Sequence, residues 1–189
     1  MTACSKVLQA LEGKSLVTAE SLTGGGIGAA LTAVPGSSAV YKGGVICYTD
    51  WVKAHVLGVP EEILNRDGAV SGAAAAAMAG GVRKCLQADV AVSVTGLAGP
   101  GGDDFGHPVG TVFIGYEDAD RSCVREFCFS GEREDVRRQT IQAALALILE
   151  FHMYYYFLIK ILILIRKASP DGAACFVIYK ERNHKTSLI

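Results

Sequence analysis

The stretch Leu16-Val-Thr-Ala-Glu-Ser-Leu-Thr-Gly-Gly-Gly-Ile-Gly28 reads as an apolar strand, a glycine-rich turn and the start of a helix, and it predicts an exposed Ser21 at the junction. This order places the Ser21 hydroxyl beside unpaired backbone N–H groups and the positive end of the helix dipole. A nucleophile and an oxyanion site can be built from those parts, and glycine lets a ligand approach the backbone closely. Taken alone, the stretch favours a simpler interpretation, in which Ser21 or Thr23 only caps the helix.

The composition indicates one folded domain followed by a tail of a different kind. The chain has 189 residues, of which 50% are hydrophobic and 20% charged, so it can bury a core and is not disordered. The net charge of −1 gives no electrostatic reason to expect a nucleic acid as a partner. Residues 1–150 carry 12 Lys and Arg against 17 Asp and Glu, whereas residues 151–189 carry 6 against 2. We therefore expect a domain over residues 1–150 and an atypical tail, apolar and then basic, over residues 151–189.

The cysteines and histidines suggest neither a metal site nor a disulfide framework. The 6 cysteines and 4 histidines are scattered along the chain, without a CxxC pair or a tight cluster. No signal peptide is expected at the N-terminus, because Lys6, Glu12 and Lys14 interrupt the apolar residues there. Reduced thiols fit a cytoplasmic protein best. The sequence thus predicts a cytoplasmic protein that needs no metal or other cofactor.

Helical and strand patterns alternate along residues 1–150. The periodicity predicts helices at about 5–11, 24–34, 50–57, 60–64, 71–86 and 132–150. Buried strands are expected at 16–19, 40–48 and 89–95, and a hairpin at 111–117 and 121–129. Helices that alternate with buried strands, followed by a hairpin, indicate an α/β fold. We expect a three-layer helix/sheet/helix sandwich with a mixed, mostly parallel sheet.

The apolar part of the tail, residues 151–165, has three interpretations. It is somewhat short for a bilayer span, and Lys160 lies near its centre, so membrane contact is not favoured. An extension of the last helix that packs on a partner subunit is at least as good an explanation. The third interpretation is that an altered reading frame produced the tail, so that it is not a selected structure. The sequence does not separate these three.

Tyr48 and Lys53 form a second candidate constellation, where a strand runs into a helix. Lys53 falls in the first turn of that helix, and the positive end of a helix disfavours a cation. A neutral lysine is what a general base requires. From its position alone, however, an ordinary solvated lysine is the commoner outcome.

A third candidate is the loop Thr95-Gly-Leu-Ala-Gly-Pro-Gly-Gly102, which directly follows a strand. Ligands on open α/β sheets bind at the carboxyl ends of strands, and successive glycine N–H groups can hold an anion. The loop is neither a P-loop nor a dinucleotide fingerprint, and it could be a flexible connection only. Ser71, after Gly68, is most simply a helix cap, whereas Glu20 could orient the Ser21 turn or be a surface carboxylate.

Several motifs together resemble the CinA C-terminal family of nicotinamide-nucleotide amidases, from about residue 5 to about residue 150. Longer members carry an additional N-terminal domain, so the chain resembles the stand-alone form. Leu22, Thr49-Asp50 and His107 depart from residues that are common in the family. The motifs that carry the resemblance are Thr18-Ala-Glu-Ser-Leu-Thr-Gly-Gly25, Pro35-Gly-Ser-Ser38, Tyr41-Lys-Gly-Gly44, Tyr48 with Lys53, Gly68-Ala-Val-Ser71, Thr95-Gly-Leu-Ala-Gly-Pro-Gly-Gly102 and Pro108-Val-Gly-Thr111.

The resemblance implies an amidohydrolase that converts nicotinamide mononucleotide to nicotinic acid mononucleotide and ammonia, a step of pyridine-nucleotide recycling. It places the catalytic serine at Ser21, the lysine at Lys53 and the tyrosine at Tyr48. Lys53 would deprotonate Ser21, directly or through Tyr48, and an acyl-enzyme would follow. It also implies a homo-oligomer, in which the small-residue helix 71–86 could pack between subunits. A non-catalytic nucleotide-binding or regulatory module of the same fold is the alternative.

The substrate-binding residues expected from these motifs lie in three glycine-rich segments. The loop after residue 95 is the candidate for the nucleotide phosphate, which its amides could hold without Arg or Lys. The expected residues are Thr23, Gly24, Gly25, Gly43, Gly44, Thr95, Gly96, Ala98, Gly99, Gly101 and Gly102.

Overall fold

The computed structural model, which describes residues 1–168, contains a five-stranded mixed sheet in the order β2-β1-β3-β4-β5. The central strand β3 pairs in parallel with β1, which pairs in parallel with β2, and antiparallel pairing joins β3 to β4 and β4 to β5. All strands but β4 therefore run in one direction, which confirms the predicted mixed, mostly parallel sheet. The strands are β1 Leu16–Glu20, β2 Tyr41–Ile46, β3 Val90–Gly96, β4 Thr111–Glu117 and β5 Ser122–Cys128.

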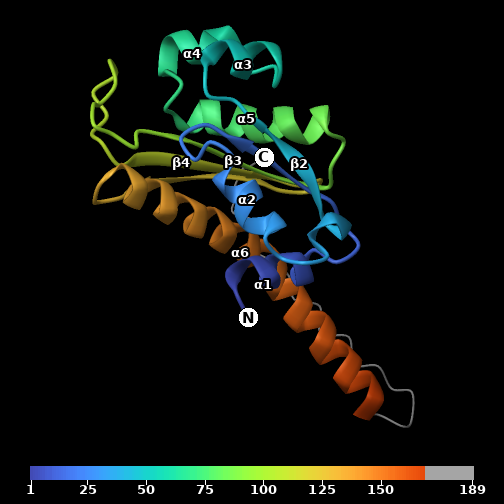
Figure 1. The fold of residues 1–189 in the computed structure, drawn as a ribbon. Helices are drawn as coiled ribbons and strands as arrows, with labels where there is room; N and C mark the ends of the chain where they lie inside the picture. The colour runs from blue at the N-terminus through green and yellow to red at the C-terminus, as the bar shows by residue number, and fades with distance from the viewer. Residues whose placement is uncertain (169–189) are drawn as a thin grey trace, which may run out of the picture. The chain divides into compact units, whose positions relative to one another are not determined.

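Helices cover both faces of this sheet (Figure 1). Helices α1, α2 and the first part of α6 pack on one face, and α5 packs on the other, with α3 and α4 beyond it. This arrangement confirms the predicted helix/sheet/helix sandwich. The helices are α1 Ala3–Ala10, α2 Gly26–Thr32, α3 Asp50–His55, α4 Glu61–Asp67, α5 Gly72–Cys85 and α6 Arg133–Ala168, with a 3-10 turn at Ser37–Ala39.

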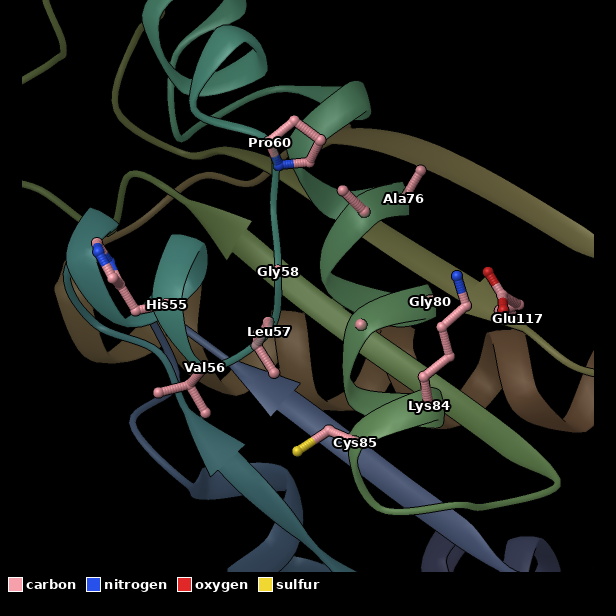
Figure 2. Close-up of a pocket in the computed structure, with 12 residues that line it drawn as sticks. His55, Val56, Leu57, Gly58, Pro60, Ala76, Gly80, Lys84, Cys85 and Glu117 are labelled. Atoms are coloured by element: carbon pink, nitrogen blue, oxygen red, sulfur yellow. The ribbon is translucent and has the colours of Figure 1, made fainter.

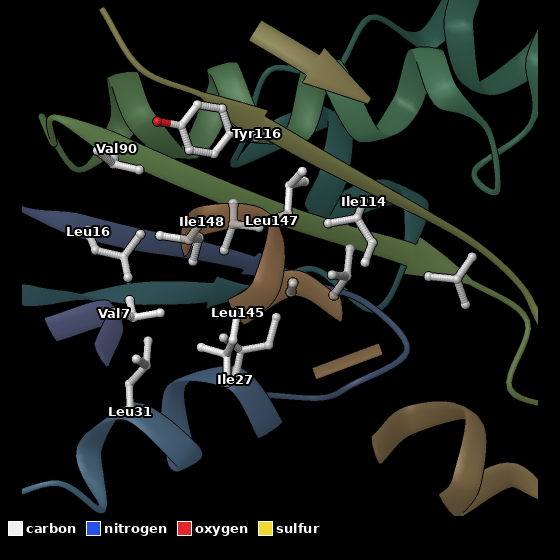
Figure 3. Close-up of a cluster of buried hydrophobic side chains, with 14 of the residues drawn as sticks. Val7, Leu16, Ile27, Leu31, Val90, Ile114, Tyr116, Leu145, Leu147 and Ile148 are labelled. Atoms are coloured by element: carbon white, nitrogen blue, oxygen red, sulfur yellow. The ribbon is translucent and has the colours of Figure 1, made fainter. Parts of the chain in front are cut away.

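Alternate residues of the central strands face two separate cores. Leu16 of β1 and Val90 of β3 point to the core under α1, α2 and α6, which Figure 3 shows. Val17 and Ala91, the next residues along, point to the core under α5. Both faces of β1 and β3 are thus buried, as expected for parallel strands covered by helices on each side.

Capping contacts explain where two of the helices begin. Ser71 caps α5 as predicted, because its hydroxyl accepts a hydrogen bond from the N–H of Ala74 at 3.1 Å. The N-cap of α3 is Thr49, whose Oγ1 accepts a hydrogen bond from the N–H of Val52.

The last helix extends further than the sequence pattern indicated. The prediction ended it at residue 150, whereas α6 continues to Ala168. The chain divides into two compact units, Met1–Tyr154 and Tyr155–Ile189. The basic end of the predicted tail, from residue 169 on, lies outside the described residues. Within the part of the chain that the structure describes, none of the helices combines the length and apolarity needed to cross a bilayer.

Candidate functional site

Ser21 lies at the carboxyl ends of three neighbouring strands. Its N–H donates to the carbonyl of Val94 in β3 at 3.0 Å, and on the other side Cys47 N–H donates to the Glu20 carbonyl at 2.9 Å. The chain therefore leaves the sheet between β2 and β3, at the edge where open α/β sheets bind ligands. The Ser21 residue is 8% exposed, so the expectation of an exposed serine is wrong.

Glu20 is the buried carboxylate that holds the Ser21 turn. It is 2% exposed, and its Oε2 accepts from the Thr23 hydroxyl at 2.7 Å and the Ile27 N–H at 2.9 Å. Its Oε1 accepts from the Gly28 N–H at 2.9 Å and the Thr18 hydroxyl at 3.2 Å. Of the two interpretations of Glu20, the orienting one is correct and the surface carboxylate is wrong.

The turn itself is built from glycines in left-handed conformations. Gly24 has φ +60° and Gly25 has φ +95°, so α2 begins at Gly26 and not at residue 24 as predicted. Thr23 is fully buried, and its hydroxyl is bonded to Glu20. A Cβ added at Gly24 would meet no described atom within 4 Å, so the space above this glycine is open.

Lys53 is buried beside the same strand ends. It is 2% exposed, which excludes the ordinary solvated lysine, and its Nζ lies 3.4 Å from Oδ1 of Asp50. Burial raises the pKa of the Cys47 thiol to about 11, and the nearby Lys53 charge opposes that rise. The N–H of Cys47 bonds the carbonyl of Glu20, the residue before Ser21, so Cys47 is near both Lys53 and the Ser21 turn, although no hydrogen bond joins Lys53 to Ser21 among the described residues.

Tyr48 is not part of this buried group. The residue is 59% exposed, and its hydroxyl accepts a hydrogen bond from Nη2 of Arg133 at 3.0 Å. Arg133 also donates from Nη1 to the carbonyl of Gly99 at 2.7 Å. Among the described residues, no hydrogen bond joins Tyr48 to Ser21 or Lys53. The structure instead links Tyr48 to the glycine-rich loop.

Six of the eight predicted substrate-binding glycines separate into two groups. At Gly44, Gly96 and Gly102 an added Cβ would press on a neighbouring atom, such as the Thr18 hydroxyl at Gly44. Close packing is therefore enough to explain these three glycines. At Gly43 and Gly101, as at Gly24, a Cβ would meet no described atom within 4 Å. A ligand could approach the backbone closely at these open positions.

The other predicted residues of the loop after β3 have structural contacts. The Thr95 hydroxyl donates to the carbonyl of Ala69 at 2.7 Å, and Ala98 is buried. Gly99 has φ +93°, and its carbonyl accepts the bond from Arg133. Their role toward a substrate stays a prediction.

Two arginines of α6 reach the site, and the sequence reasoning missed both. Arg137 donates to the carbonyl of Leu22 at 3.2 Å and to that of Thr23 at 3.0 Å, so it fixes the turn after Ser21. Arg133 precedes it by one helical turn and holds Tyr48 and Gly99. Arg133 and Arg137 are four residues apart, so the sequence does place them on the same face of the helix. It does not show which loop that face contacts.

Residues with metal-ligating side chains do not gather at this site or elsewhere in the described part of the chain, where no group of three or more could hold an ion. A volume of about 820 Å³ lies apart from the site, between the α3–α4 connection and the second half of α5. Figure 2 shows Leu57 and Pro60 on one wall and Cys85 on the other. None of the predicted site residues lines it.

The chain is similar to proteins of bacteria in one family. A CinA-like protein of Endomicrobium trichonymphae is 47% identical over 139 residues, which cover 73% of this chain and 32% of that protein. A CinA-like protein of Thermosynechococcus vestitus is 51% identical over 121 residues, which cover 64% of this chain and 29% of that protein. The chain thus spans about a third of the length of the curated relatives that it matches.

Solved structures match over most of their length. A CinA superfamily protein from Klebsiella pneumoniae has a TM-score of 0.78 and 35% identity, covering 80% of this chain and 96% of that chain. The competence/damage inducible protein CihA from Agrobacterium tumefaciens has a TM-score of 0.76 and 36% identity, covering 78% of this chain and 92% of that chain. The model of the CinA C-terminal domain matches residues 2–152, and the chain therefore belongs to the CinA C-terminal domain family.

Proposed function

We propose that the chain is an amidohydrolase that converts nicotinamide mononucleotide to nicotinic acid mononucleotide and ammonia. The observation that carries this proposal is the burial of Lys53 beside the strand ends that hold Ser21. A serine and a buried lysine at the carboxyl edge of a parallel sheet are the parts of a Ser-Lys nucleophile. Membership of the CinA family supports the proposal, since the sequence motifs resemble its amidases.

In this mechanism Lys53 accepts the proton of the Ser21 hydroxyl, and the Ser21 oxygen forms a bond to the carboxamide carbon. The N–H groups of Leu22 and Thr23 donate to no acceptor among the described residues, and they directly follow the nucleophile in the chain. We assign them to the oxyanion, since the residue after a nucleophile often supplies such a donor. The C–N bond then breaks, and Lys53 returns the proton to the leaving nitrogen, which departs as ammonia. Water, deprotonated by Lys53, cleaves the ester and restores Ser21.

We favour a direct proton route from Ser21 to Lys53 over a relay through Tyr48, because the Tyr48 hydroxyl is bonded to Arg133.

The loop that holds Gly99 and Gly101 would bind the phosphate of the substrate. Arg133 adds a positive charge at this loop. From the sequence we expected glycine amides alone to donate hydrogen bonds to the phosphate. We now add the Arg133 side chain as a further donor.

The test is ammonia release from nicotinamide mononucleotide by the purified full-length chain, with Ser21→Ala and Ser38→Ala measured in parallel. Ser38 is exposed and lies just before the amino end of β2, away from the carboxyl ends that hold Ser21, so it controls for the loss of any serine. The proposal expects release by the wild type and by Ser38→Ala, and none above background by Ser21→Ala. Release by a folded Ser21→Ala variant at the wild-type rate would rule out the covalent mechanism.

A non-catalytic nucleotide-binding or regulatory module is the second candidate, and one observation favours it. The Nζ of Lys53 donates to the carboxylate of Asp50 at 3.4 Å, and no hydrogen bond joins it to Ser21 among the described residues. This candidate predicts that nicotinamide mononucleotide binds, as calorimetry would detect, with no ammonia released. Under the amidase proposal, Asp50→Asn retains or increases ammonia release, whereas the second candidate predicts none from either protein.

A further inference from the structure

The hydrogen bonds at Glu20 require a carboxylate, and the amide group of a glutamine could not replace it. Each carboxylate oxygen accepts one backbone N–H of α2, with Ile27 on Oε2 and Gly28 on Oε1, both at 2.9 Å. A glutamine in this place would carry one oxygen and one NH₂ group. Either orientation of that amide would point a donor at a backbone N–H. Only a group that accepts at both ends fits this position.

The carboxylate also closes the turn that carries Ser21. Glu20 directly precedes Ser21 in the chain, and its side chain reaches the amides seven and eight residues further on. The Thr23 hydroxyl, inside the turn, binds the same carboxylate. Both ends and the middle of the turn are therefore fixed by one buried side chain. Because buried hydrogen bonds to a charged group are stronger than neutral ones, the turn has little freedom.

The network extends from Glu20 to the neighbouring strand. The Thr18 hydroxyl bonds Glu20 on one side and the Tyr41 hydroxyl of β2 on the other, at 2.8 Å. A Cβ on Gly28 would lie 2.6 Å from the Tyr41 oxygen, and one on Gly44 would lie 2.8 Å from it. These two glycines leave room for the tyrosine to reach the network.

We propose that Glu20 is a positioning residue for catalysis, which sets the place of the Ser21 oxygen through the turn and does not itself touch the substrate. The inference rests on the proposed amidase function and deepens it. A nucleophile displaced by about 1 Å can lose about 10²-fold in rate, while the binding of the substrate is changed far less. Loss of the Glu20 carboxylate should therefore lower kcat and leave KM nearly unchanged.

The experiment compares Glu20→Gln with Asp118→Asn in the full-length chain. Asp118 is a matched control, because it is also a buried carboxylate with several hydrogen bonds but lies in the β4–β5 hairpin. Three quantities are measured for each variant: kcat for ammonia release, KM for the same reaction, and the rate of amide hydrogen exchange in peptides that cover residues 16–32.

The proposal expects exchange in the turn of Glu20→Gln to be about tenfold faster or more, and kcat to fall by about 10- to 100-fold with KM within about threefold. Asp118→Asn should leave kcat, KM and the exchange in the turn unchanged, although it destabilises the fold. Unchanged exchange in Glu20→Gln, or faster exchange with an unchanged kcat, would overturn the proposal. So would an equal fall of kcat in Asp118→Asn. If the wild type releases no ammonia, the amidase proposal fails, and the exchange result alone decides whether Glu20 fixes the turn.

Discussion

The replacement of His152 by glutamine tests how a buried network sets the acid stability of the domain. The Tyr116 hydroxyl donates to Oδ2 of Asp118 at 2.6 Å and lies 2.8 Å from Nε2 of His152. A hydroxyl has one proton, so His152 must donate its Nε2–H to the tyrosine oxygen. The neutral imidazole therefore suffices for this contact. Glutamine offers an NH₂ donor of similar reach without an ionisable ring.

The pKa of His152 gives the size of the effect. Burial lowers it from 6.5 to about 4, and the charges of Lys14 and Arg121 act in the same direction. Between pH 6.5 and about 4, His152 is therefore protonated in the unfolded chain but stays neutral in the folded chain. Each pH unit between these values removes about 1.4 kcal/mol from the free energy of unfolding. The full loss is about 3 kcal/mol, of which about 2 kcal/mol is reached at pH 5.

The assay is urea denaturation of wild type and His152→Gln at several pH values from 7 to 4, followed by far-ultraviolet circular dichroism. All other titrating groups are shared, so the difference between the two proteins isolates His152. Asp118 affects the pH dependence of stability only at lower pH. Burial alone would raise its pKa, but hydrogen bonds from Tyr116 and Arg121 lower it to about 2. Its stabilising contribution is present above its ordinary pKa and is lost as the pH falls toward 2.

We expect the wild type to lose about 2 kcal/mol more than His152→Gln between pH 7 and pH 5. Equal losses in the two proteins would refute the reasoning. An NMR titration that gave His152 in the folded protein a pKa near 6.5 would refute it as well, because burial would then not disfavour the charged ring.

Three more predictions follow from contacts at or near the site. Lys53→Ala should lower kcat for ammonia release by at least about 10²-fold, and a loss below tenfold in steady-state kinetics would exclude Lys53 as the base. Ser71→Ala should lower the free energy of unfolding by about 1 kcal/mol, while Ser71→Thr keeps most of it, as urea titrations would show; equal losses would contradict the cap. Arg137→Met removes two bonds to carbonyls of the Ser21 turn, so kcat should fall while the unfolding midpoint changes little; an unchanged kcat would show that the turn needs no such support.

The sequence predicted the order of the elements because apolar patterns and caps are local. The buried β1 and β3 strands, the hairpin of β4 and β5 and the Ser71 cap all follow from residues close together in the chain. Boundaries were less accurate where conformation depends on a particular glycine. Helix α2, for instance, starts only after the two left-handed residues of the turn.

The site was predicted only in part, because its contacts join distant segments. The burial of Lys53 comes from how α3 meets the strand ends, and position alone favoured a solvated lysine. Arg137 contacts a carbonyl 115 residues away, and no pattern near it indicates that loop. The role of Glu20 depends on a turn that folds back on itself, so its sequence neighbours left two interpretations open.

A direct measurement of the central claim is mass spectrometry of the protein quenched during turnover of nicotinamide mononucleotide. The account predicts a covalent acyl adduct on the peptide that contains Ser21, which disappears when the substrate is exhausted and never forms in Ser21→Ala. An adduct on a different residue would contradict the account, and so would ammonia release by the Ser21→Ala variant at the wild-type rate.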